Sequence, residues 1–86
     1  MPEEDDARRL VEVAIERAGG ARFIVGSPRH PFALKSTREE EVEGHEVIIH
    51  FSEISAPAIA MVGQWVFEIR ETELVVLSRP RRRPAQ

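Results

Sequence analysis

Hydrophobic residues recur at helical spacing near the start of the chain. They fall at i, i+3, i+4, i+7, i+8 and i+11, which is typical of one buried helix face. These residues are Ala7, Leu10, Val11, Ala14, Ile15 and Ala18. Acidic residues precede the stretch, where the helix dipole favours negative charge, and Gly19-Gly20 follows it as a stop signal. The pattern predicts a helix over residues 5–18, with Asp5 or Asp6 as the N-cap.

After Gly19-Gly20 the period of the hydrophobic residues changes from that of a helix to that of extended strands. Two segments, residues 45–52 and 64–70, alternate clearly and predict strands. The side chains expected on one common face are Val47, Ile49, Phe51, Trp65, Phe67 and Ile69. We expect this face to pack against the helix and to form the core with it.

Shorter extended segments are predicted at residues 22–25, 32–38 and 74–77. Residues 39–44 hold four glutamates and end in glycine, which predicts a charged turn. Residues 58–62 fit two interpretations, because their apolar positions match both a strand and a short helical turn. We favour the strand.

Together these elements predict an α+β fold, with one N-terminal helix packed on a four- to five-stranded antiparallel sheet, because short connections favour antiparallel pairing. The element order is that of cystatin-like folds, which is an analogy of order alone. A chain of 86 residues is too short for two cores, so one domain is expected over residues 1–78. Residues 79–86 hold four arginines and two prolines and predict a disordered basic tail.

Apolar residues also occur at positions of the opposite parity, on the sheet face turned away from the helix. Ile48 and Val66 lie there, together with one of the pair Val75 and Leu77. A face open to solvent would be more uniformly polar, so we expect this one to be covered by a partner or to line a pocket. Singly exposed apolar residues, which are common on protein surfaces, are the alternative interpretation.

The charge of the chain is divided unevenly. The net charge is −3, and the last eight residues carry four arginines and no acid, which leaves −7 for residues 1–78. An acidic body argues against a nucleic-acid-binding domain, and four tail charges give only weak, salt-sensitive contacts with phosphates. No apolar stretch is long enough to span a membrane and the N-terminus is acidic, so we expect a cytoplasmic protein that does not bind membranes.

The residues available for chemistry are few, since cysteine and tyrosine are absent. His45 and His50 are five residues apart in an expected strand and point to opposite faces, so we expect neither a metal site nor a cofactor. His50 and Ser52 share a face, but such neighbours are about 6–7 Å apart, beyond hydrogen-bond reach for a serine and its base. The sequence therefore favours a function without catalysis.

Our leading interpretation is a small non-catalytic, homodimeric protein-binding module, acting as an assembly factor or as an acidic inhibitor or immunity-type protein. The first alternative is a small-molecule-binding domain or minor enzyme with a pocket between helix and sheet. That interpretation places Trp65, His50, Met61 and Arg70 near the ligand. The second alternative is weak nucleic-acid binding through the arginine-rich tail.

Overall fold

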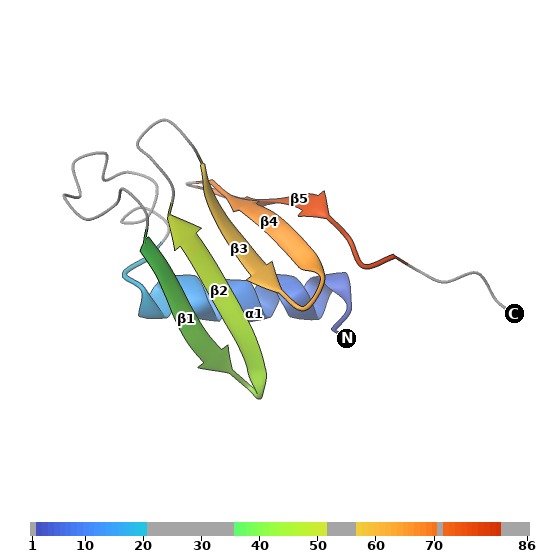
Figure 1. Ribbon diagram of the computed structural model, residues 1–86, viewed down its shortest axis with the longest axis horizontal. Helices are drawn as coiled ribbons and strands as arrows, with labels where there is room; N and C mark the ends of the chain where they lie inside the picture. The colour runs from blue at the N-terminus through green and yellow to red at the C-terminus, as the bar shows by residue number, and fades with distance from the viewer. Residues whose placement is uncertain (1, 21–35, 52–56, 71, 82–86) are drawn as a thin grey trace, which may run out of the picture.

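The fold was obtained as a computed structural model, which describes residues 2–20, 36–51, 57–70 and 72–81. Within them, one helix precedes a sheet of five strands. The elements are α1 (Glu4–Arg17), β1 (Ser36–Val42), β2 (His45–Phe51), β3 (Ala58–Val62), β4 (Trp65–Ile69) and β5 (Leu74–Ser78). The strands pair antiparallel in sequence order, and α1 packs on one face of the sheet (Figure 1). This arrangement confirms the predicted α+β fold.

The helix buries the face that its apolar spacing predicted, because every one of those six residues is at most 7% exposed. Its end is a Schellman motif, in which the Gly20 N–H donates to the Ile15 carbonyl (2.8 Å) and the Gly19 N–H to the Glu16 carbonyl (3.1 Å). Gly19 has φ 113°, a conformation that residues with a Cβ rarely adopt. The predicted stop signal is thus confirmed.

The predicted N-cap was wrong by two or three residues. The N-cap is Glu3, which makes no side-chain capping bond, while Asp5 and Asp6 lie inside the first turn. Carboxylates there still face the positive end of the helix dipole. The acidic start therefore stabilises the helix through its charge, and not through a side-chain cap.

Strand β1 corrects the expectation of a charged turn at residues 39–44. The turn holds only Glu43 (φ 52°) and Gly44 (φ 82°), and two consecutive positive φ values are typical of a two-residue type I′ hairpin. An edge strand with one face in water tolerates charged residues, and Val42 at its end anchors it in the core. Most of the strand predicted at 32–38, and all of that at 22–25, falls outside the described residues.

Residues 58–62 form a strand, so the alternative of a helical turn was wrong. A second tight turn, with Gly63 at φ 59°, joins this strand to β4 and sets Val62 opposite Trp65. The turn fixes which residues face α1, because side chains alternate along a strand. In β3, Ala58, Ala60 and Val62 are buried, while Ile59 and Met61 point to the other face.

The ladder between β4 and β5 is interrupted by a bulge. Val66 pairs with Ser78 and Phe67 with Val76, which leaves Leu77 as the extra residue of β5. Arg8 of α1 donates a hydrogen bond to the Leu74 carbonyl (2.7 Å), so a helix side chain occupies one backbone acceptor of this edge strand.

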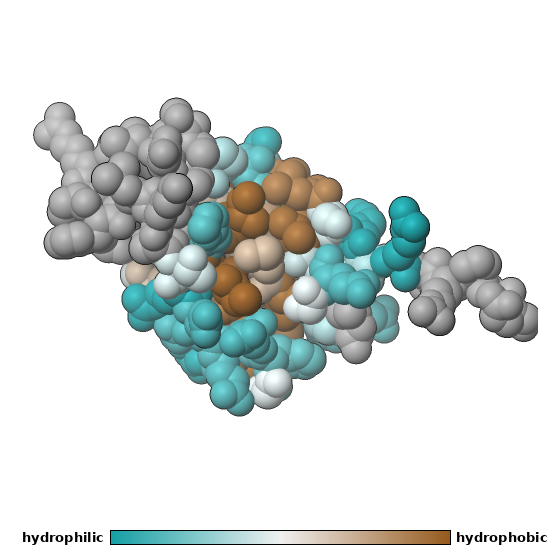
Figure 2. Space-filling view, viewed as in Figure 1, coloured by the Kyte–Doolittle hydropathy of each residue, from teal (hydrophilic) through white to brown (hydrophobic). Residues whose placement is uncertain are grey.

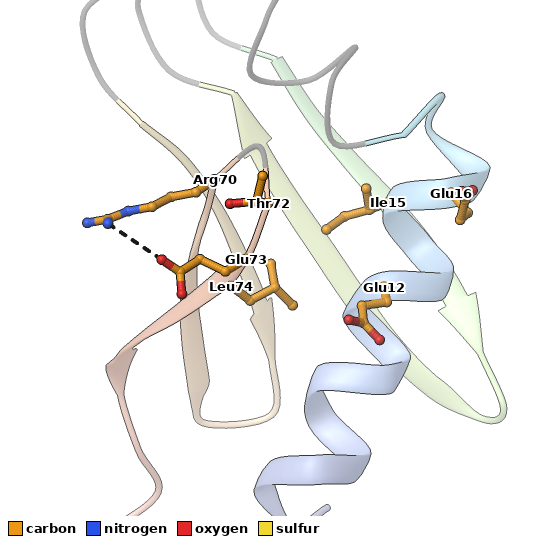
Figure 3. A pocket seen from close by; sticks show the side chains of 7 residues that line it. All are labelled: Glu12, Ile15, Glu16, Arg70, Thr72, Glu73 and Leu74. Atoms are coloured by element: carbon orange, nitrogen blue, oxygen red, sulfur yellow. Dashed lines mark ion pairs between the residues drawn. The ribbon is translucent and has the colours of Figure 1, made fainter.

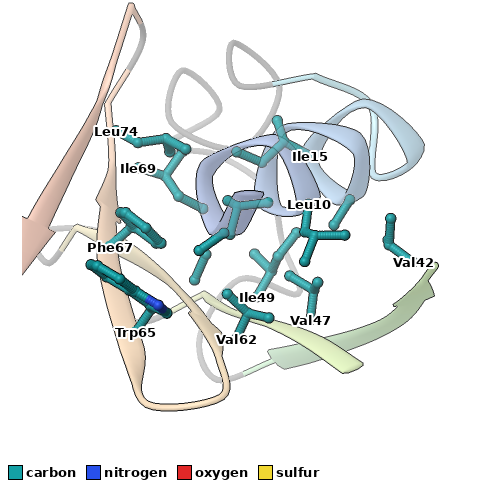
Figure 4. Close-up of a cluster of buried hydrophobic side chains, with 14 of the residues drawn as sticks. Leu10, Ile15, Val42, Val47, Ile49, Val62, Trp65, Phe67, Ile69 and Leu74 are labelled. Carbon is teal, nitrogen blue, oxygen red and sulfur yellow. The ribbon is translucent and has the colours of Figure 1, made fainter. Parts of the chain in front are cut away.

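The core lies between α1 and the sheet (Figure 4). Of the six strand residues predicted to face the helix, five are buried: Val47, Ile49, Trp65, Phe67 and Ile69. The Phe51 side chain falls outside the described residues. Among the described residues, no helix is long and apolar enough to cross a membrane.

Candidate functional site

The sheet face opposite α1 carries a continuous apolar patch. Met61 pairs across the strands with Ile48 on one side and with Val66 on the other. In the next row, Glu68 separates Ile59 from Val75. All five apolar side chains are partly exposed, and we call them the far-face patch. Figure 2 views this face and shows hydrophobic atoms over its centre with hydrophilic atoms at its borders.

Sequence analysis predicted part of this surface. Ile48, Val66 and Val75 belong to the far-face patch, and Leu77 beside them is the most exposed large hydrophobic side chain described, at 50%. Ile59 was not assigned to this face, since the identity of residues 58–62 as a strand was open. The two-residue turn Gly63-Gln64 would have shown on which face Ile59 lies, because it sets the register between β3 and β4.

The far-face patch is bordered by acidic residues toward one edge of the sheet and by a basic residue beyond the other edge. Glu39, Glu41 and Glu46 are exposed on β1 and β2, at far-face positions. Glu41 lies directly opposite Glu46, and like charges in this position destabilise a strand pair. Their side chains have no basic partner within the described residues. This part of the surface therefore attracts cations.

At the opposite edge of the sheet, β5 is followed by Arg79, which turns toward the helix side, and by Arg81. Arg79 forms an ion pair with Glu4, and its guanidinium lies 5.7 Å from the centroid of the Trp65 ring. Arg81 is exposed and pairs with no acid among the described residues. Figure 1 shows this segment and the β1–β2 hairpin on opposite sides of β3.

Glu4 links two arginines above stacked aromatic rings. Its carboxylate pairs with Arg79 and with Arg8 (2.9 Å), and hydrogen bonds first from Arg79 and then from Arg8 lower its pKa. Arg8 lies 5.5 Å from the centroid of Phe67, which is stacked on Trp65 at 5.9 Å. This cluster connects the start of α1 to the chain after β5.

The four residues predicted to surround a small ligand do not meet at one place. Trp65 is buried on the helix side, where its indole N–H donates to the Pro2 carbonyl (2.8 Å). His50 and Met61 lie on the far face. Arg70 follows β4 and pairs with Glu68 (2.9 Å), which raises the pKa of this arginine.

A hollow of about 310 Å³ does lie between α1 and the β4–β5 connection (Figure 3). It is lined by Glu12, Ile15, Glu16, Arg70, Thr72, Glu73 and Leu74. Arg70 extends away from the helix toward Glu73, at 4.0 Å. Ligand pockets of enzymes are usually enclosed, whereas this hollow is wide open, with the carboxylates of Glu12, Glu16 and Glu73 around it. The hollow therefore gives no argument for a small-molecule site.

Two features common at catalytic sites, a cluster of metal ligands and a buried titratable group, do not occur among the described residues. No three metal-ligating side chains gather among them, and no charged or polar side chain described is buried. His50 accepts or donates one hydrogen bond with the Thr37 hydroxyl (3.1 Å) at the surface. Burial of a titratable group is what commonly shifts a pKa toward catalytic use.

The chain matches no protein-family model, no curated protein and no solved structure. The surface of the chain itself is therefore the guide to its function. Its most unusual feature is the far-face patch, because the solvated face of an antiparallel sheet is normally polar.

Proposed function

We propose that the chain is a non-catalytic protein-binding module that forms a homodimer through the far-face patch. The observation that supports this proposal is the run of aliphatic side chains across three neighbouring strands, from Ile48 through Met61 to Val66. Covering such side chains removes apolar surface from water, at about 25 cal/mol per Å². A binding partner would therefore stabilise the sheet.

A second copy fits this surface for physical reasons. A two-fold interface brings one patch against the same patch, so the patch has to complement itself. Aliphatic side chains meet that condition, and Met61 at the centre has an unbranched side chain that adapts to its neighbours. Two sheets packed in this way form a sandwich with about 10 Å between them.

The test is the mass of the protein in solution. We expect light scattering after size-exclusion chromatography to give twice the chain mass of 9.8 kDa. Met61→Glu should give the monomer mass, because it places a charge in the apolar interface opposite the same charge of the partner. Far-ultraviolet circular dichroism of this variant should stay unchanged, since Met61 is outside the core.

The matched control is Thr72→Glu, which adds the same charge at an exposed position beside α1, away from the far-face patch, and should remain dimeric. A wild-type protein that is monomeric at the highest concentration reached would contradict the proposal. So would a Met61→Glu variant that dimerises as well as the wild type does.

An acidic inhibitor or an assembly factor is the wider role that we propose for such a dimer. The support is the net charge of −7 over residues 1–78, which favours a basic partner. Dimerisation through the far-face patch would leave α1 and the acidic hollow beside it on the outside.

A further inference from the structure

The distribution of charge around the far-face patch distinguishes two ways of stacking the sheets. In both, the two-fold axis lies between the sheets and passes near Met61. If the axis runs along β3, strand β1 of one copy lies over β5 of the other. If it runs across the strands, β1 lies over β1 and β5 over β5. The following inference rests on the proposed homodimer and concerns its orientation.

We infer that the axis runs along β3, so that the acidic β1–β2 side of each copy faces Arg81, which follows β5 of its partner. Glu41 and Glu46 lie near the hairpin end of β1 and β2, and Arg81 follows the end of β5. Figure 1 shows that the β1–β2 hairpin, the β3–β4 turn and the end of β5 lie at the same end of the sheet, with the hairpin and the end of β5 on opposite sides of β3. Rotation about β3 therefore brings the hairpin of one copy over the end of β5 of the other.

The acidic side gains from this orientation. Glu41 and Glu46 repel each other across the hairpin and have no basic partner within the described part of their own chain. Arg81, which pairs with no acid among the described residues, supplies the opposite charge from the other copy. Rim pairs of this kind contribute little affinity, but they select the orientation by making alternatives unfavourable.

The crossed orientation lacks this compensation. The row through the patch runs from Glu39 over Ile48, Met61 and Val66 to Ser78. With the axis along this row, Glu39 of one copy faces Glu39 of the other. Like charges would then meet at the interface, and Arg81 would have no glutamate of β1 or β2 opposite it.

Distances between single spin labels distinguish the two orientations. The chain contains no cysteine, so Glu39→Cys and Gln64→Cys each give one label per copy. Strands are about 4.8 Å apart and stacked sheets about 10 Å apart. With the axis along β3, labels on β1 are separated by four strand spacings and the gap, about 22 Å, while labels in the β3–β4 turn are about 10 Å apart.

The crossed orientation reverses these values. Labels at position 39 would then be about 10 Å apart, and labels at position 64, three residues from the axis, about 22 Å apart. Both labelled proteins are first shown to be dimers by light scattering, so that a monomer contradicts the proposed function. A dimer with the reversed distances would overturn the orientation alone.

A charge exchange supplies a second measurement. Arg81→Glu should weaken the dimer two- to five-fold in sedimentation equilibrium at low salt, and Glu46→Arg in the same chain should restore it. The Arg81→Glu effect should fade as salt is added, because exposed charges are screened. A dissociation constant unaffected by Arg81→Glu would overturn the proposed charge pairing.

Discussion

Two isoleucines on opposite faces of the sheet provide a direct test of the fold. Ile69 in β4 is 2% exposed and faces α1, whereas Ile59 in β3 is partly exposed on the far face. Truncation of a buried isoleucine to alanine costs about 2–5 kcal/mol, because it removes apolar contacts and leaves a cavity. The whole domain is expected to have a free energy of unfolding of about 4–13 kcal/mol. Ile69→Ala should therefore remove a large share of the stability.

Ile59→Ala is the matched substitution and should cost about 1 kcal/mol or less, because its side chain already touches water. Both are measured by urea unfolding followed by circular dichroism, at a concentration low enough to dissociate the proposed dimer. If Ile69→Ala does not fold, Ile69→Val should still lose about 0.5–1.5 kcal/mol while Ile59→Val loses almost nothing. Equal losses at the two positions would refute the assignment of the faces.

Two further predictions concern the surface. Glu4→Gln removes a carboxylate whose pKa is held below 4.5 by Arg79 and Arg8, so its stabilising effect is present above that pH and is lost as acid protonates the folded state. The wild type should be more stable than Glu4→Gln in urea titrations at neutral pH and equal to it in strong acid. A constant difference would contradict the pairing. Gly44→Ala should cost about 1–2 kcal/mol in the same assay, because φ is +82° although no atom lies within 4 Å of the added Cβ. A Gly44→Ala protein as stable as the wild type would contradict the turn.

The parts of the fold predicted correctly are those in which one physical preference dominates. The helical period in α1 and the alternation in β2 and β4 predicted which face of each element is buried, and the structure confirms all three predictions. The position of β1 was predicted wrongly, because its glutamates disfavour a strand locally. Pairing with β2 decides its conformation instead. Its boundary was nevertheless encoded at Glu43-Gly44, which forms the tight hairpin.

The far-face patch was predicted only at Ile48, Val66 and the end of β5. Residues 58–62 are all apolar, so their sequence does not show on which face each side chain lies. The register across the Gly63-Gln64 turn supplies that information and adds Ile59 and Met61 to the patch. The ion pair of Arg79 with Glu4 joins residues far apart in the chain, and a local sequence pattern does not predict such a contact.

The hydrogen bond from Arg8 to the Leu74 carbonyl has a consequence for aggregation. An open sheet edge is a template on which strands of other molecules can add without limit, as in fibrils. At the β5 edge an arginine already occupies one acceptor and a bulge distorts the ladder, while the β1 edge is lined with glutamates. Concentrated solutions of the protein should for this reason resist fibril growth, and Arg8→Ala should shorten the lag before a fibril-binding dye responds.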